Sequence, residues 1–416
     1  MIKRILCYKI RIYNLNQAIG RYDFNIERGG IVIKIENDIL NLKKHIVDVR
    51  RALHQIPESG LQENETTDYI LGYLAKLGLT VERGVSGTGA IAYLEGSIGK
   101  RTIAYRADID ALSVDEQTGV EYCSTKPGYM HACGHDGHTA ILLGFANYAA
   151  QHRNSIKNNL LFIFQPAEEG PGGAEAIVNA GILEKYKVSN IFGLHIYPEV
   201  EEGLAACRPG AMMAQTGEFD IQIKGKSAHG AMPHKGSDAL LAAASTVTAL
   251  NTVVSRNVDP LEAAVLTIGR FESGERRNII AGDAMLEGTL RAFNEETYTA
   301  VRNRLIKTVK HLPESFECTA ELEIRDMYPA VTNDAEMFEL FKAAIGEENL
   351  EIIKPMTISE DFSYFQRRVP GLFFMLGSRN VAMGYINPLH SNKFNFNEDI
   401  LLTGIQIFEN IRKQFE

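Results

Sequence analysis

The order of strand-like and helix-like segments most restricts the fold of this chain, because that order changes at residue 214 and changes back near residue 325. Before residue 214, helices are predicted over 36–53, closed by Pro57, and over 64–77, stopped by Gly78. Strands that alternate with further helices are predicted at GAIAYLEG, TIAYRADID, NLLFIFQ and IFGLHI. This alternation predicts an α/β layer with a mostly parallel sheet flanked by helices.

The segment 214–324 follows another rhythm. Its predicted order is strand (GEFDIQIKG), helix (238–254), strand (AVLTIGRFESG), strand (AMLEGTLRAF), helix (295–311) and strand (TAELEIRD). That order matches a split βαβ, ferredoxin-like α+β domain. Afterwards PGLFFMLG predicts a core strand and 397–415 a terminal helix. The chain is therefore expected to form a main domain, 36–213 and 325–416, split by an inserted domain, 214–324.

Length and charge limit the class of protein. The 416 residues are 45% hydrophobic and carry a net charge of −9, which is typical of a globular protein of roughly two or three domains. The acidic total argues against a nucleic-acid partner, and no apolar run approaches the ~18 residues that span a membrane. Five scattered cysteines do not resemble a disulfide framework and indicate a cytoplasmic location.

Residues 1–35 differ from the rest, with seven basic and two acidic side chains. Their net charge of +5 leaves −14 on the remaining chain. The basic residues interrupt every apolar run, so no signal peptide is expected. The segment is interpreted as a peripheral extension, either an arm packed on the main body or residues that precede a natural start near Val32.

The segment MHACGHDGH, residues 130–138, carries the strongest chemical signal. It places Cys133 and His135 two positions apart, in a chain with only 11 histidines. Thiolate and imidazole are ligands that borderline-soft divalent metals prefer. His138 is open to a structural role and His131 to an orienting one.

Further donor types follow the predicted strands. Glu168 and Glu169 follow NLLFIFQ, and Asp108 and Asp110 end TIAYRADID. Sites in open α/β sheets lie beyond the carboxyl ends of strands. Because adjacent glutamates differ in direction, one is expected to ligate metal while the other faces the substrate as general base. With two further histidines the candidate set reaches five donors, which suits two metal ions better than one: Cys133, His135, Glu169, His195 and His390.

These motifs, with QPAEEGPGGA, GKSAHGAMPH, EGTLRAF, SEDF and LHSNKF, resemble the amidohydrolase branch of the aminoacylase/carboxypeptidase-type dinuclear metallopeptidases. That branch includes hippurate hydrolases, indoleacetyl-amino-acid hydrolases and N-acetyldiaminopimelate deacetylases, and the resemblance spans residues 38–415. It implies metal ligation by the five donors, with Zn, Mn, Ni or Co as candidate ions. Glu168 becomes the general base and Asp110 a supporting carboxylate, with Asp108 left open for that role.

The resemblance also implies that the inserted domain is a lid through which the chain forms a homodimer. His229 then polarises the scissile carbonyl in the partner subunit, while Asn278 and Arg291 hold a substrate carboxylate. The implied reaction is hydrolysis of small N-acyl amino acids. The stretches 255–271 and 277–291 look closest to the bacterial subgroup that deacetylates N-acetyl-L,L-diaminopimelate in lysine biosynthesis.

Three alternatives remain open on the sequence. One is a broader hippurate or N-acyl-amino-acid hydrolase, which no motif separates from the deacetylase. Another is a non-catalytic oligomeric binding module on the same fold. The third is a structural zinc protein, which would close all four coordination positions, whereas this ligand set leaves room for water.

Overall fold

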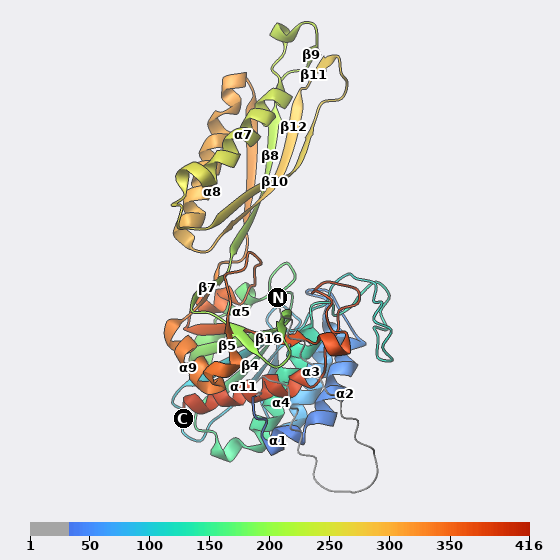
Figure 1. Ribbon diagram of the computed structural model, residues 1–416, viewed down its shortest axis with the longest axis vertical. Helices are drawn as coiled ribbons and strands as arrows, with labels where there is room; N and C mark the ends of the chain where they lie inside the picture. The colour runs from blue at the N-terminus through green and yellow to red at the C-terminus, as the bar shows by residue number, and fades with distance from the viewer. Residues whose placement is uncertain (1–32) are drawn as a thin grey trace, which may run out of the picture. The chain divides into compact units, whose positions relative to one another are not determined.

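The computed structural model describes residues 33–416 (Figure 1). The interpretation of residues 1–35 therefore falls outside the described residues, except for its last three. Of these, Ile33 is buried in the main hydrophobic core. No helix within residues 33–416 has the length and apolar character needed to cross a membrane.

The larger sheet has eight strands, in the order β1-β2-β4-β3-β5-β16-β6-β15. The central strands β4, β3, β5 and β16 run parallel to one another, while β1, β2 and the β16–β6 pair add antiparallel neighbours. The sheet is therefore mixed, with a parallel centre. Its strands are β1 (Thr80–Arg83), β2 (Ala90–Leu94), β3 (Thr102–Asp108), β4 (Asn159–Gln165), β5 (Val188–Glu201), β6 (Ala205–Cys207), β15 (Leu350–Ile352) and β16 (Gly371–Arg379).

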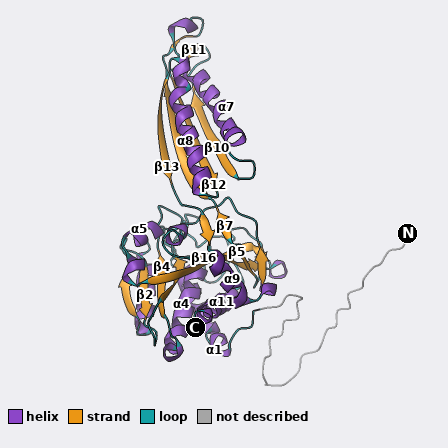
Figure 2. Ribbon diagram, turned by 90° about the vertical axis from the view of Figure 1, so that its left-hand side faces the viewer, coloured by secondary structure: helices purple, strands orange, loops and turns teal. Residues whose placement is uncertain are grey.

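Helices flank this sheet, as Figure 2 shows in side view. Helix α4 packs on β3 and β5 and contacts α2, α3 and α11. It is buried from its first residue to Ala149, because nearly every side of HTAILLGFANYAA is apolar. The helices outside the inserted segment are α1 (Asn37–Leu40), α2 (Lys43–His54), α3 (Asn64–Lys76), α4 (His135–Gln151), α5 (Ala174–Asn179), α6 (Ile182–Lys185), α9 (Ala335–Ile345), α10 (Ser363–Gln366) and α11 (Ile400–Gln414).

The second unit is an antiparallel sheet of four strands, in the order β10-β12-β8-β13, with α7 and α8 packed against it. It has its own hydrophobic core, and its strands alternate buried and exposed residues because the helices cover one face. The predicted order of six elements is confirmed: β8 (Gln215–Lys224), α7 (Ala239–Asn257), β10 (Ala264–Ser273), β12 (Asp283–Ala292), α8 (Glu295–His311) and β13 (Thr319–Asp326).

Short strand pairs complete the fold: β7 (Gly210–Met213) with β14 (Val331–Asn333), and β9 (Ala228–His229) with β11 (Ile279–Ile280). The chain passes between the two large sheets at 214–216 and again at 326–328. These two segments, called the crossover below, pair through the amide of Met327 with the carbonyl of Thr216, and the amide of Thr216 with the carbonyl of Tyr328.

Two local expectations were wrong. The single helix over 36–53 is two helices, because the chain breaks at Asn41–Leu42 between α1 and α2. His195 was placed near a strand end but lies inside β5, which continues to Glu201 as it curves past β16.

Candidate metal centre

The candidate donors gather at the carboxyl edge of the parallel strands, as the sequence predicted. Asp108 ends β3, and Gln165 ends β4 just before the loop 166–173, called the glutamate loop below, which carries Glu168 and Glu169. Cys133 precedes α4, and His135 is the first residue of that helix. Between them Gly134 has φ 88°, a left-handed conformation that glycine adopts without strain. The rigid, buried helix thus fixes the direction of the His135 ring.

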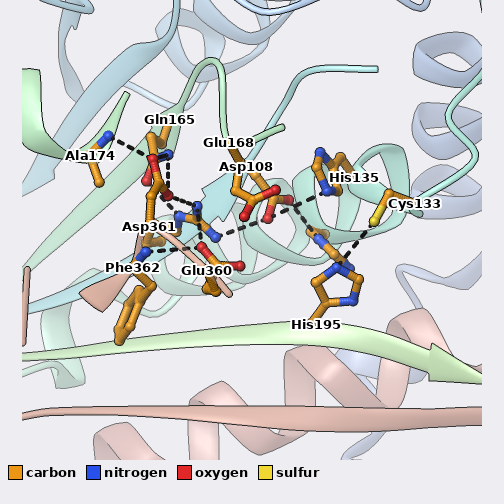
Figure 3. A network of polar contacts seen from close by, with 12 residues as sticks. Asp108, Cys133, His135, Gln165, Glu168, Ala174, His195, Glu360, Asp361 and Phe362 are labelled. Carbon is orange, nitrogen blue, oxygen red and sulfur yellow. Dashed lines mark hydrogen bonds and ion pairs between the residues drawn. The ribbon is translucent and has the colours of Figure 1, made fainter. Parts of the chain in front are cut away.

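Five donor side chains form two overlapping groups in the structure, and Figure 3 shows the group of Cys133, His135 and His195. The ligand atoms of Cys133, His135 and His195 lie within 4.8 Å of one another, as do those of Cys133, Glu169 and His390. Cys133 belongs to both groups. These five residues are called the donor cluster below, and the shared thiol gives them the connectivity that a two-metal centre needs.

The hydrogen bonds of the histidines leave particular nitrogens free. His195 donates from Nδ1 to the carbonyl of Ile196 at 2.7 Å, so its Nε2, 3.4 Å from Cys133 Sγ, carries the lone pair. His135 Nδ1 lies 3.2 Å from Asp110 Oδ1, and its Nε2 is buried without a hydrogen-bond partner. Glu169 Oε1 is also buried, and its contact with His390 Nε2 at 3.3 Å does not have the geometry of a hydrogen bond. Unpaired buried acceptors are costly, so these atoms and this donor chemistry fit divalent cations.

The two aspartates of TIAYRADID have different neighbours. Asp110 accepts from His135 Nδ1 and from the amide of Glu169 at 3.0 Å, so it links one candidate ligand to the loop that carries another. Asp108 accepts from His138 Nδ1 at 2.6 Å, and its Oδ2 is 3.8 Å from His135 Nε2. Of the two, Asp110 is thus the one bonded to the second nitrogen of His135, the usual place of a supporting carboxylate.

The remaining histidines of MHACGHDGH differ in how they are satisfied. His138 uses both ring nitrogens, because Nδ1 contacts Asp108 and Nε2 accepts from the amide of Ile196 at 2.8 Å. It has no nitrogen left for a metal. His131 is buried, and neither of its ring nitrogens has a hydrogen-bond partner. Burial lowers the pKa of His131 to about 3, so this ring is neutral.

The two glutamates of the glutamate loop have pKa values that are shifted in opposite directions. Burial, together with the charges of Glu360, Asp361 and Glu169, raises the pKa of Glu168 well above its usual value. Burial also opposes ionisation of Glu169, but the His390 ring, whose Nε2 lies 3.3 Å from Glu169 Oε1, and the charge of His135 lower the pKa of Glu169 to about 2. Two adjacent carboxyl groups with separated pKa values are suited to different roles.

A second buried polar cluster lies beside the donors, and it was not predicted from the sequence. Arg106, in the middle of β3, donates from Nε to Gln165 Oε1 at 2.8 Å and from Nη1 to Asp108 at 2.9 Å. Its Nη2 donates to Glu360 and to Asp361, both at 2.9 Å. Arg106, Asp108, Gln165, Glu360 and Asp361 are called the arginine cluster below. The signal in the sequence was a lone arginine within an otherwise apolar strand.

A similar arrangement surrounds Arg50 on α2. Asp136, next to His135, accepts from Arg50 Nε at 2.8 Å and from His54 Nδ1 at 2.7 Å. The other nitrogen of His54 is 3.2 Å from Glu116. All of these side chains are buried or nearly so, and together they fix the first turn of α4 behind His135.

Three predicted substrate residues lie in the four-stranded unit. His229 pairs with Ile279 across β9 and β11, and the amide of Gly230 donates to the carbonyl of Asn278, so His229 and Asn278 are neighbours. Arg291 is on β12 and half-buried, where it donates to the carbonyl of Leu290 at 2.9 Å. Within residues 33–416, no hydrogen bond or ion pair joins these three to the donor cluster.

The fold and the site together define a class of protein. A mixed sheet that gathers thiol, imidazole and carboxylate donors with unpaired atoms at its carboxyl edge, beside a buried glutamate, is the architecture of a metal-dependent hydrolase. The chain belongs to the peptidase family M20/M25/M40, whose family model matches residues 104–414.

Several relatives are similar over most of their length. The chain is 39% identical to the N-acetyldiaminopimelate deacetylase of Bacillus velezensis, over 88% of this chain and 97% of that one. It is 41% identical to the enzyme of that name from Brevibacillus brevis, over 86% and 95%. The solved Bacillus subtilis YXEP protein, described as a dinuclear metal-binding peptidase of the M20 family, is 31% identical at a TM-score of 0.78, over 90% of this chain and 98% of that one. The family resemblance read from the motifs is confirmed.

Proposed function

We propose that this chain is an N-acetyl-L,L-diaminopimelate deacetylase. The observation that carries the proposal is the 39–42% identity to bacterial enzymes of that name, over 80–88% of the chain. The buried donor cluster supports the chemistry, because amide hydrolysis on this fold needs ligands for cations and a carboxyl group beside them.

The proposed cofactors are two divalent cations, held by the donor cluster with Cys133 common to both. When bound, such cations lower the pKa of a water molecule and polarise an acyl oxygen. Glu168 would accept the water proton and then deliver it to the leaving amine. Its raised pKa suits the second of these tasks. Asp110 accepts from Nδ1 of His135 and would thereby leave Nε2 of that ring free to ligate a cation.

The inserted unit is proposed to supply the substrate contacts. In this proposal 214–324 forms a lid domain and 36–213 with 325–416 forms the catalytic domain. Arg291 and Asn278 would bind the carboxylate beside the scissile amide, because a guanidinium pairs with both oxygens of a carboxylate. His229 would donate to the acyl oxygen of a substrate bound in the partner subunit.

We also propose a homodimer that works in the cytoplasm. In support of the dimer, β10 is an edge strand of the four-stranded sheet. Leu240, Leu241 and Phe271, on α7 and β10, are between 43% and 51% exposed. Exposed apolar side chains beside an open strand edge are typical of a surface that a second copy covers. Light scattering coupled to gel filtration would give the oligomeric state.

The test of the function is a deacylation panel with the full chain. N-acetyl-L,L-diaminopimelate, hippurate and several N-acetyl amino acids are assayed after chelation and after adding Mn²⁺, Zn²⁺, Ni²⁺ or Co²⁺. We expect kcat/KM to be highest for N-acetyl-L,L-diaminopimelate, and turnover to vanish with chelator and to return with metal. A preference for hippurate would favour the broader hydrolase, and no turnover with any metal would refute an enzymatic role.

A further inference from the structure

Tyr328 connects the crossover to the loop that carries the proposed general base. It stands two residues beyond Asp326, the last residue of β13, on the segment that returns from the four-stranded sheet. Its side chain is 8% exposed, and its hydroxyl donates to the backbone carbonyl of Glu168 at 2.8 Å. A residue of the crossover therefore holds the main chain of Glu168 itself.

The glutamate loop is held elsewhere by carboxylates of the surrounding main fold. At its start, the amide of Ala167 donates to the buried Glu63 at 2.8 Å. At its end, the amides of Gly173 and Ala174 donate to Asp361 Oδ2, each at 3.0 Å. At the first of these anchors, Ala167 has φ 58°, a conformation that costs an alanine free energy. The bond from Tyr328 restrains the residue that follows this strained position.

The Tyr328 ring has a place built for it. Gly172, at φ 103°, lies directly against it, and a Cβ added there would be 3.0 Å from Cε1 of Tyr328. On another side the ring meets Tyr364 edge to face, with 6.4 Å between ring centroids. The hydroxyl of Tyr364 donates to the carbonyl of Met327 at 3.3 Å, so this hydrogen bond reaches the crossover and not the glutamate loop.

The backbone of Tyr328 belongs to the pairing of the crossover. Its carbonyl accepts from the amide of Thr216 at 2.9 Å, and the amide of Met327 donates to the carbonyl of Thr216 at 3.0 Å. The two segments of the crossover are therefore hydrogen-bonded to each other at Tyr328. A rotation of the four-stranded unit about the crossover would move these backbones first, because hinge motions concentrate in such connecting residues.

We propose that Tyr328 is a positioning residue, which sets the direction of Glu168 from the crossover and makes that direction depend on the orientation of the four-stranded unit. The proposal rests on the proposed function for the role of Glu168. Its physical basis is that the Glu168 carboxyl group is attached to a main chain that is hydrogen-bonded to Tyr328. Small displacements of a catalytic group strongly lower the rate of the catalysed reaction.

The test compares Tyr328→Phe with Tyr364→Phe in the full chain loaded with metal. Both variants remove one hydroxyl from the crossover region, but only Tyr328→Phe removes the bond to Glu168. We expect Tyr328→Phe to lower kcat about tenfold while KM stays within about twofold. Tyr364→Phe is expected to keep both constants within about twofold, and the metal content of both variants should equal that of the wild type.

Hydrogen exchange of the peptide 166–174 gives a readout that is independent of turnover. We expect exchange of this peptide in the metal-free chain to be several-fold faster in Tyr328→Phe than in the wild type or in Tyr364→Phe. Unchanged exchange, unchanged kcat, or an equal effect of both substitutions would overturn the proposal. If the wild type hydrolyses no substrate of the panel, the proposed function fails, and exchange alone decides whether Tyr328 holds the loop.

Discussion

Two buried polar clusters lie side by side at the carboxyl edge of one sheet, and they differ in how their polar atoms are paired. In the arginine cluster, no buried nitrogen or oxygen of a side chain lacks a hydrogen-bond partner. In the donor cluster, His135 Nε2 and Glu169 Oε1 are buried without one. Burying an unpaired polar atom costs free energy, and a paired cluster avoids that cost. The first cluster is complete within the fold, whereas the second is completed by what it binds.

Glu168 lies between them and shares in both. Its carboxylate is within 4.8 Å of ligand atoms of His135 and Glu169, and also of Glu360 and Asp361. In the proposed mechanism, the reaction thus occurs at the boundary between the arginine cluster, which is paired within the fold, and the donor cluster, which would bind the cations.

The largest effect is expected for Glu168→Gln. Without the carboxylate, proton transfer is lost, and kcat should fall by about 10²–10⁴. The metal content measured by elemental analysis should stay at the wild-type level, because Glu169 and the other donors remain. The exposed Glu175 serves as the control, since Glu175→Gln should leave kcat unchanged. Unchanged turnover of Glu168→Gln would remove this residue from the mechanism.

Next in size is Arg106→Met, which breaks the paired cluster. It leaves Asp108, Glu360 and Asp361 buried without the guanidinium that pairs with all three. Removing one partner of a buried ion pair costs about 3–5 kcal/mol of stability. Urea unfolding of the metal-free variant should show this loss. Arg51→Met, which removes an exposed ion pair with Glu398, should cost less than about 1 kcal/mol. Equal losses of unfolding free energy in the two variants would contradict a special role of the buried arginine cluster in stability.

Removal of metal should affect the other cluster. Cations bound only by the folded state at 100–1,000 times their Kd add roughly 3–4 kcal/mol of stability, so chelation should lower Tm by several degrees. In Cys133→Ala most of this difference should disappear, because both donor groups lose their shared ligand. The exposed Cys123 is the matched control, and Cys123→Ala should keep the full shift. Differential scanning calorimetry with and without chelator measures all three.

The smallest effect concerns pH and the Arg50 side of α4. Although burial opposes it, hydrogen bonds from His54, the amide of Ser124 and Thr118 lower the pKa of Glu116 to about 2. A carboxyl whose pKa is lowered by folding stabilises the protein above its unfolded value near 4.5, and this contribution disappears as the pH falls through 2. Glu116→Gln should therefore cost up to ~2 kcal/mol above pH 5, with a gap that narrows between pH 4.5 and 2. Chemical unfolding across that range measures the gap, and a gap independent of pH would contradict this assignment.

The sequence predicted the residues of the donor cluster better than the surrounding residues that hold them in position. Cys133, His135 and Glu169 stand out because thiol, imidazole and paired carboxylates are rare together in loops that follow strands. The helices and strands of 214–324 were equally clear, since their periodicity is local. The break at Asn41–Leu42 and the continuation of β5 past His195 depend on contacts with distant segments, which periodicity does not contain.

The arginine cluster and the contact of Tyr328 with Glu168 were beyond the reach of the sequence. Arg106 and Glu360 are 254 residues apart, and Tyr328 is 160 residues from Glu168. Each residue is unremarkable in its own segment, and only the folded arrangement brings the partners together. Such long-range polar contacts are what the structure adds to the pattern of motifs.

The distribution of the five donors along the chain has a consequence for biosynthesis. Four of them precede residue 196, whereas His390 follows the whole inserted segment and lies close to the carboxyl terminus. During translation the thiol, the first imidazoles and the glutamate emerge early, and the last imidazole becomes available only after the inserted segment has been made. If the five donors ligate as proposed, the complete centre can therefore assemble only after the inserted segment and His390 have been made.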